Sequence, residues 1–212
     1  YTTLFRSVAE PLDVNHLVKT KKERTDRVVR ALEQAGMVPA EDFFHRYPHE
    51  LSGGQRQRVV LASSMIMDPT FIVADEPVSM LDASVRVEVL KLMRALQEDH
   101  NISFIYITHD LSTVRYFSEY IFVMYAGLIV EKAKQYDLLT NPKHPYTQAL
   151  ISAVPVPGKR GGRIVLKGET PSAANPPSGC PFHPRCPEKV DRCRTVVPET
   201  VRDGGRLFSC HL

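Results

Sequence analysis

The chain contains no long hydrophobic run, and this limits what it can be. A membrane-spanning helix needs about 20 consecutive apolar residues. The best candidate, residues 121–130, is short and is interrupted by Gly127. Positive and negative charges nearly balance, since the net charge is only +3 over 212 residues. This excess is too small to indicate a nucleic-acid-binding surface. With 43% hydrophobic and 24% charged residues, the composition favours one large domain, or a domain with an appendage.

Cysteine is rare and confined to one stretch. The four cysteines follow the spacing C-x5-C-x6-C-x16-C, without the paired C-x2-C of common zinc sites. In a chain expected to act in the cytosol, disulfides are disfavoured. Four thiolates suit an iron–sulfur cluster, and a zinc ion or reduced structural thiols are the alternatives; His183 or His211 could replace one thiolate. The candidate ligands are Cys180, Cys186, Cys193 and Cys210.

A phosphate-binding loop of the G-x-x-x-x-G-K-[ST] type is absent from the sequence. The nearest candidate, residues 161–163, lacks the lysine and follows no predicted strand. The chain by itself therefore has no conventional cradle for the phosphates of a nucleotide.

One stretch nevertheless has the features of an anion-binding helix start. Residues 51–58 read LSGGQRQR. Ser52 is a good N-cap, and Gln55 can complete a capping box. Gly53 and Gly54 leave the first helical N–H groups open to another backbone or to a phosphate, which the helix dipole also favours. Taken alone, such a segment is more often just a turn and a helix cap.

Two predicted strands end in polar side chains. Residues 71–74 form a continuous apolar run typical of a buried parallel strand, and Asp75 and Glu76 follow it. Residues 102–107 predict a second strand, which ends just before His109. Because open α/β sheets place ligands at the carboxyl ends of their strands, Glu76 and His109 are candidates for one site.

The order of the elements predicts the fold class. A helix over 83–97, which Asp82 can cap, separates the two strands, and 120–125 and 128–131 predict two more. This alternation indicates an α/β fold with right-handed βαβ units on a largely parallel sheet.

The octapeptide, taken with the acidic strand end and the histidine, resembles the signature and associated motifs of ATP-binding-cassette (ABC) ATPases. The resemblance implies a partial P-loop NTPase fold, with ATP and Mg²⁺ as ligands. It also implies a head-to-tail dimer in which each signature binds the nucleotide of the partner subunit. The implied roles are nucleotide binding in trans by Ser52, Gly53, Gly54 and Gln55, Mg²⁺ binding through water by Asp75, activation of water by Glu76, γ-phosphate contact by His109 and dimer coupling by Asp82.

The tail resembles a narrower group. Residues 141–150 (NPKHPYTQAL) and 179–187 (GCPFHPRCP) are similar to the C-terminal extension of the ATP-binding subunits of oligopeptide and dipeptide importers. Nickel and other small-solute importers share this extension, so they stay as alternatives. Residues 76–82 look more like the F-type than the D-type subunit. In relatives the extension carries a 4Fe–4S cluster, which here would use the four cysteines.

The resemblance further implies partners and a location. They are a second ABC ATPase subunit, two membrane permease subunits and, indirectly, a substrate-binding protein, at the cytoplasmic face of a bacterial or archaeal membrane. No nucleic acid is implied. A DNA-repair or translation ATPase of the same superfamily is disfavoured by the tail motifs and the mild charge. A non-catalytic iron–sulfur module is disfavoured by Glu76.

The predicted division of the chain is a helical subdomain at 8–68, the rest of the ATPase core at 69–136 and the cysteine-bearing extension at 137–212. Residues 1–7 match the translation of a common sequencing adapter, so we leave them out of the predicted fold. The phosphate cradle and the family's glutamine loop would precede Val8. We therefore expect a fragment that hydrolyses no ATP alone and that leaves a sheet edge exposed.

Overall fold

The computed structural model describes residues 2–155, 162–172 and 174–212. They form two compact units, Tyr1–Asp110 (unit 1) and Leu111–Leu212 (unit 2). This division falls inside the predicted 69–136 segment, so the domain boundaries taken from the family organisation stay a prediction. Among the described residues, no helix is both long enough and apolar enough to cross a membrane.

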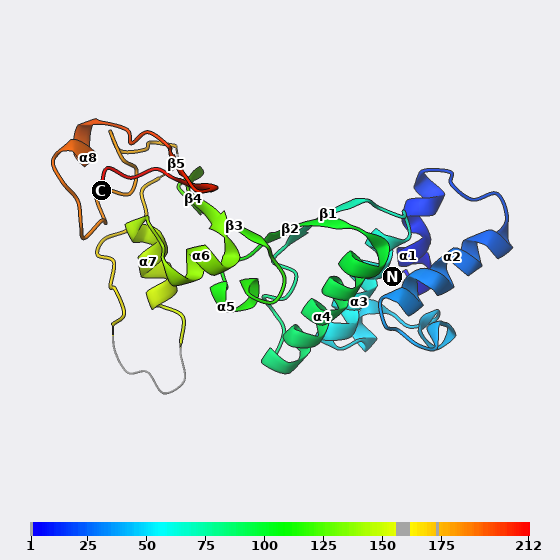
Figure 1. Cartoon of the computed structure of the whole chain (residues 1–212). Helices are drawn as coiled ribbons and strands as arrows, with labels where there is room; N and C mark the ends of the chain where they lie inside the picture. Colours follow the sequence, from blue (N-terminus) through cyan, green and yellow to red (C-terminus); the bar gives the residue numbers. More distant parts are fainter. Residues whose placement is uncertain (1, 156–161, 173) are drawn as a thin grey trace. The chain divides into compact units, whose positions relative to one another are not determined.

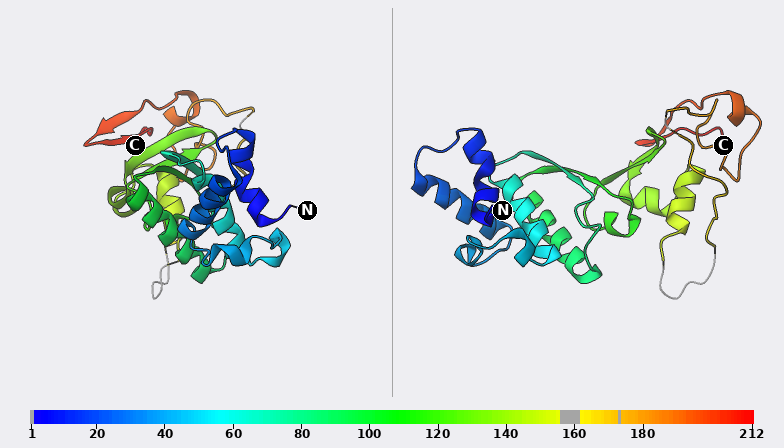
Figure 2. Two further views of the ribbon diagram at one scale, coloured as in Figure 1. Left: turned by 90° about the vertical axis from the view of Figure 1, so that its right-hand side faces the viewer. Right: turned by 180° about the vertical axis from the view of Figure 1, so that it is seen from behind.

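The first part of unit 1 is helical (Figures 1 and 2). Its α-helices are α1 (Leu4–Val14), α2 (Lys21–Gln34) and α3 (Gly53–Met65), and two short 3₁₀ helices, η1 (Ala40–Phe43) and η2 (Pro48–Glu50), lie between α2 and α3. The Thr20 hydroxyl accepts from the Glu23 N–H and so caps α2. The apolar faces of these helices form one core, whose members include Val8, Leu12, Val28, Leu32 and Ala62.

The structure includes part of the N-terminal stretch that we left out of the predicted fold. Leu4 begins α1 and is 1% exposed in the helical core. The Leu4 N–H donates to the Arg46 carbonyl, and the Phe5 ring packs edge-on against Phe44. Leu4 and Phe5 therefore take part in the packing of unit 1.

A βαβ unit follows the helices. Strand β1 (Phe71–Asp75) pairs in parallel with β2 (Ser103–Ile107), with Asp75 opposite Ile107. Helix α4 (Ala83–His100) connects them, and it extends three residues past the predicted end to a left-handed Asn101. Within the described chain, this sheet has two strands.

The prediction that β1 is buried on both faces is wrong for this structure. Ile72 and Ala74 are buried, whereas Phe71 and Val73 are about half exposed, at 51% and 56%. The reason is that the described residues cover only one face of the two-stranded sheet, so the side chains alternate between core and surface.

Unit 2 contains an antiparallel sheet in the order β3-β4-β6-β5. The prediction of a largely parallel sheet therefore holds only for β1 and β2. Strands β3 and β4 form a hairpin turned by Ala126 and Gly127, both at positive φ. The elements of the unit are α5 (Leu111–Val114), β3 (Tyr120–Tyr125), β4 (Leu128–Lys134), α6 (Gln135–Thr140), α7 (Pro145–Ser152), α8 (Arg192–Thr195), β5 (Val201–Asp203) and β6 (Arg206–Phe208).

The C-terminal stretch packs onto this sheet rather than forming a separate appendage. Strand β6 pairs with β4, placing Leu207 opposite Lys132. Phe182, 1% exposed, lies among the rings of Tyr125, His144 and Tyr146. Side chains from the predicted core and from the predicted extension therefore share one hydrophobic cluster.

Candidate functional site

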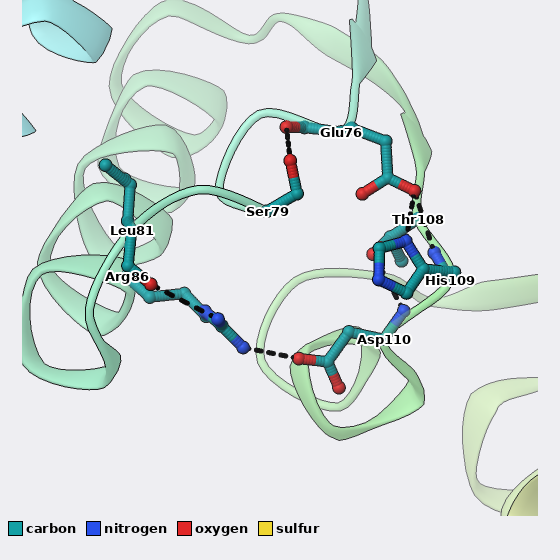
Figure 3. A network of polar contacts seen from close by, with 7 residues as sticks. All are labelled: Glu76, Ser79, Leu81, Arg86, Thr108, His109 and Asp110. Carbon is teal, nitrogen blue, oxygen red and sulfur yellow. Dashed lines mark hydrogen bonds and ion pairs between the residues drawn. The ribbon is translucent and has the colours of Figure 1, made fainter. Parts of the chain in front are cut away.

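The structure brings Glu76 and His109 together at the carboxyl ends of β1 and β2. The Glu76 Oε1 lies 2.6 Å from His109 Nδ1 and accepts from the His109 backbone N–H at 3.1 Å (Figure 3). The Glu76 N–H in turn donates to the Ile107 carbonyl. Their proximity follows from the parallel pairing of the strands; their catalytic roles stay predictions.

Glu76 also has an unusual backbone conformation. Its φ is +48°, in the left-handed region that a residue with a side chain adopts at a cost of roughly 1–3 kcal/mol. The Ser79 N–H and hydroxyl both bond to the Glu76 carbonyl and stabilise the turn. The side chains stay accessible, at 35% for Glu76 and 79% for His109, so a carboxylate and an imidazole face solvent where a water and a phosphate could bind.

The other acidic candidates lie at the two ends of the segment that joins β1 to α4. Asp75 is exposed at the end of β1, next to Glu76. Asp82 occupies the N-cap position of α4, but its side chain makes no capping hydrogen bond, so the prediction that this carboxylate caps the helix is wrong. The exposed Asp82 side chain is therefore free of a local helix-capping role.

The predicted capping box at the start of α3 is confirmed. The Ser52 hydroxyl accepts from the Gln55 N–H at 3.2 Å, and Gln55 Oε1 accepts from the Ser52 N–H at 3.0 Å. Ser52 and Gly53 are exposed, so the helix start is open to a ligand.

Gly54 has a different reason to be glycine from the one the sequence suggests. It is buried, and a Cβ built on it would lie 2.4 Å from Val85 Cγ1 on α4. A Cβ on Gly53 would meet only the flexible Leu81 side chain, at 3.3 Å. Gly54 therefore lets α3 approach α4 closely, whereas Gly53 leaves the helix start open.

We expect Gly54→Ala to destabilise unit 1 by ~1–3 kcal/mol, because the added methyl overpacks against Val85. Gly53→Ala is the matched control, with a smaller effect since Leu81 can move. Urea unfolding of each variant measures this, and Val85→Ala in the Gly54→Ala background should recover most of the loss. Equal stability of the Gly53→Ala and Gly54→Ala variants would contradict the packing argument.

The four cysteine side chains of unit 2 are free thiols that lie near one another. Cys180 and Cys193 are buried, and Cys186 and Cys210 are partly buried. Burial raises the pKa of Cys186 to about 11 and raises the pKa of Cys180 and Cys210, and neighbouring cysteines contribute in the same direction. Among the residues that the structure describes, no group of three or more His, Cys, Asp or Glu is arranged to hold a metal ion.

A buried polar network lies under the tail motif of unit 2. Glu131, fully buried, accepts from the backbone N–H groups of Lys143 (2.8 Å) and His144 (2.9 Å), and Arg206 Nη2 lies 3.7 Å from its Oε1. His144 Nδ1 accepts from the Tyr146 N–H and caps α7. Sequence reasoning missed Glu131 and Arg206, because nothing in the sequence marks a glutamate in a strand as buried.

His144 should make the stability of unit 2 depend on pH. Burial lowers its pKa from 6.5 to about 4, so the folded protein keeps the imidazole neutral while the unfolded chain protonates it below 6.5. Stability is therefore complete above pH 6.5 and is lost as the pH falls toward 4. Between pH 7 and pH 5 we expect a loss of ~2 kcal/mol.

Urea unfolding of the wild-type chain and of His144→Asn at these two pH values measures the effect. The asparagine can still cap α7 but cannot titrate, so the pH-dependent loss should shrink in this variant. An equal loss in both proteins would contradict the assignment to His144.

Comparisons with known proteins match this chain to ABC transporter ATPases. The ABC transporter family model matches residues 3–79, and the model described as "Oligopeptide/dipeptide transporter, C-terminal region" matches residues 130–193. The dimeric structure of the ABC transporter cassette MJ0796 is 29% identical, with a TM-score of 0.55, over 63% of this chain and 56% of that chain. The structure of cbiO1 from Clostridium perfringens is 26% identical, with a TM-score of 0.58, over 66% and 54%. The chain has the α/β fold of part of an ABC ATPase cassette.

Curated transport proteins are also similar to this chain, over nearly all of its length. The oligopeptide transport ATP-binding protein AppF of Bacillus subtilis is 47% identical over 99% of this chain, and the dipeptide transport ATP-binding protein DppF of Haemophilus influenzae is 45% identical over 95%. The chain spans 64% and 62% of the lengths of these two relatives. Over these shares the chain is similar to ATP-binding subunits of ABC transporters that serve peptide transport.

Proposed function

We propose that this chain is the part of an ABC importer ATPase that carries the signature helix, the catalytic glutamate and the switch histidine, and that the importer takes up oligopeptides or dipeptides. The observation that carries the proposal is the contact between Glu76 and His109 at the ends of β1 and β2. The matches to peptide-transport ATP-binding proteins support the substrate class.

Each residue has a distinct role in the proposed hydrolysis. Glu76 orients the attacking water and accepts its proton. His109, held by Glu76, donates a hydrogen bond to the γ-phosphate. The exposed start of α3 at Ser52 and Gly53 supplies N–H groups and the positive end of a helix dipole to a nucleotide bound by a second ATPase subunit. Asp82 lies on the loop that faces that subunit.

Mg²⁺ is the metal implied by this chemistry. The exposed Asp75 carboxylate at the end of β1 is an oxygen ligand of the kind Mg²⁺ prefers, and it would hold the ion through water. The ion would neutralise charge that develops on the β- and γ-phosphates.

The proposed partners follow from the same assignment. A second ABC ATPase subunit provides the facing nucleotide, and membrane permease subunits convert closure and opening of the ATPase pair into alternating access. A substrate-binding protein delivers the peptide to the permeases. The subunit would act at the cytoplasmic face of the bacterial or archaeal membrane, peripherally attached to the permeases.

The test is a transporter assembled in proteoliposomes, with this chain's sequence in one ATPase subunit. We expect phosphate release that increases with a dipeptide or oligopeptide delivered by the binding protein. Stimulation by Ni²⁺ with its binding protein, and not by peptides, would overturn the substrate class. A lack of ATP hydrolysis by the assembled transporter would overturn the proposed activity.

We also propose that the cysteine group holds a 4Fe–4S cluster. Its thiols interact electrostatically with one another, and backbone N–H groups of Phe182 and His183 near Cys180, and of His211 and Leu212 near Cys210, offset part of the rise in pKa that burial causes. Hydrogen bonds to sulfur are a feature of iron–sulfur sites. A cluster would balance the charge of the thiolates, which burial alone disfavours.

The cluster assignment predicts a brown protein after anaerobic purification, with four iron atoms per chain. Cys186→Ala should lose most of the visible absorption and iron, whereas the control Ser209→Ala, next to Cys210, should keep both. A colourless wild-type protein that contains stoichiometric zinc or no metal would contradict the assignment.

A further inference from the structure

The strongest unassigned feature is Arg86, near the start of α4. Its Nη1 lies 2.5 Å from Asp110 Oδ2, and its Nη2 donates to the Leu81 carbonyl at 3.2 Å (Figure 3). Both partners of the ion pair are partly buried, at 28% and 30% exposure. One guanidinium group therefore joins the loop after β1 to the turn after β2.

The hydrogen bond from Arg86 to the Leu81 carbonyl holds a segment that contacts the signature helix α3. Leu81 and Val85 are the side chains closest to the open faces of Gly53 and Gly54. The backbone that Arg86 holds at Leu81 therefore belongs to the segment on which the start of α3 rests. A displacement of the α3 start would act first on these two side chains, because they fill the space beside the glycines.

The ion pair of Arg86 with Asp110 lies next to the proposed catalytic pair, Glu76 and His109. Asp110 directly follows His109, and its N–H donates to the Thr108 hydroxyl. The exposed His109 ring is held by Glu76, so its position depends on the backbone turn that carries it. The Arg86–Asp110 ion pair holds this turn from another element.

We infer that Arg86 is a positioning residue for ATP hydrolysis, linking the signature side of the subunit to the His109–Glu76 pair. The inference rests on the proposed ATPase function. The planar, forked guanidinium group can bind the Asp110 carboxylate and the Leu81 carbonyl at the same time, and a lysine ammonium reproduces this geometry only in part. Both printed contacts of the guanidinium group are to protein groups, the Asp110 carboxylate and the Leu81 carbonyl, so Arg86 acts by placing the groups that would meet the nucleotide.

The first experiment measures hydrolysis in the assembled transporter. We expect Arg86→Ala to lower kcat by about 10-fold or more while KM for ATP changes little, because small misplacement of catalytic groups slows the chemical step. Arg86→Lys should recover part of kcat. Arg94→Ala is the matched control, since Arg94 lies on the same helix and also forms an ion pair at 2.5 Å, with Glu98 on the surface.

The second experiment needs no hydrolysis. In the 212-residue chain, the ¹⁵N NMR signals of the His109 ring report its contact with Glu76, and comparison with Glu76→Gln gives the signature of the broken contact. Arg86→Ala and Asp110→Asn should both shift the His109 signals toward that signature. Arg94→Ala should leave them at the wild-type position.

The outcomes separate the two proposals. An active wild-type transporter whose kcat is unchanged by Arg86→Ala overturns the role of Arg86. An inactive wild-type transporter overturns the ATPase function, and the NMR result then decides whether Arg86 positions His109. If Arg86→Ala does not fold, Asp110→Asn and Arg86→Lys give the same comparison, and unchanged His109 signals in both overturn the inference.

Discussion

Replacing Glu76 with glutamine is expected to lower kcat for ATP by ~10²–10⁴-fold in the assembled transporter, the range that a general base contributes. The amide keeps the size of the side chain and a carbonyl oxygen that can accept from the His109 N–H. It removes the negative charge and basicity that the attacking water needs. Because nucleotide binding does not depend on that base, KM should change far less than kcat.

Steady-state phosphate release with saturating ATP is the measurement. Glu98→Gln makes the same chemical change on the exposed face of α4, where Glu98 pairs with Arg94, and it should leave kcat within about twofold. Turnover by Glu76→Gln at the wild-type rate would show that the carboxylate nearest His109 is not the base.

The largest loss of stability is expected from Arg206→Ala. The guanidinium group of Arg206 donates to the carbonyls of Asp137 and Asn141 at the end of α6. Its Nη2 lies 3.7 Å from Oε1 of the fully buried Glu131. Removal of the guanidinium group leaves a buried carboxylate without its counter-charge and the Asn141 carbonyl without its arginine donor, whereas the Asp137 carbonyl still accepts from the Asn141 N–H. Breaking a buried pair in this way costs about 3–5 kcal/mol.

Urea unfolding measures this cost. Amide hydrogen exchange in β3 and β4 is the readout, so that the unfolding of unit 2 is observed directly. Arg202→Ala, an exposed arginine on the neighbouring strand β5, is the control and should be close to neutral. Glu131→Gln combined with Arg206→Met should be less destabilised than Arg206→Ala, because no buried charge is left alone. Equal stability of Arg206→Ala and Arg202→Ala would show that the pair contributes nothing.

Local and nearest-neighbour signals in the sequence were enough for much of the candidate site. The Ser52–Gln55 box predicted the start of α3, and the apolar runs predicted β1 and β2, because caps and strand patterns depend on residues close in the chain. The meeting of Glu76 and His109 followed from one further rule, that parallel strands end at the same edge of a sheet.

The sequence could not supply contacts that depend on how elements pack. The approach of Gly54 to Val85, the ion pair of Arg86 with Asp110 and the joining of β6 to β4 link segments that no periodic pattern connects. The same limit explains the wrong prediction that β1 is buried on both faces, since burial depends on which elements cover a strand.

The sequence by itself therefore determined the type and order of the main elements, the capped helix start and the chemical groups at the strand ends, because short-range hydrogen bonding and apolar periodicity decide these. Only the tertiary structure decided why Gly54 must lack a side chain, which residue links the loop before α4 to the histidine turn, and how Glu131 is neutralised by an arginine of the tail. Each of these depends on close packing or on charge pairing between distant residues, and both are properties of the folded chain.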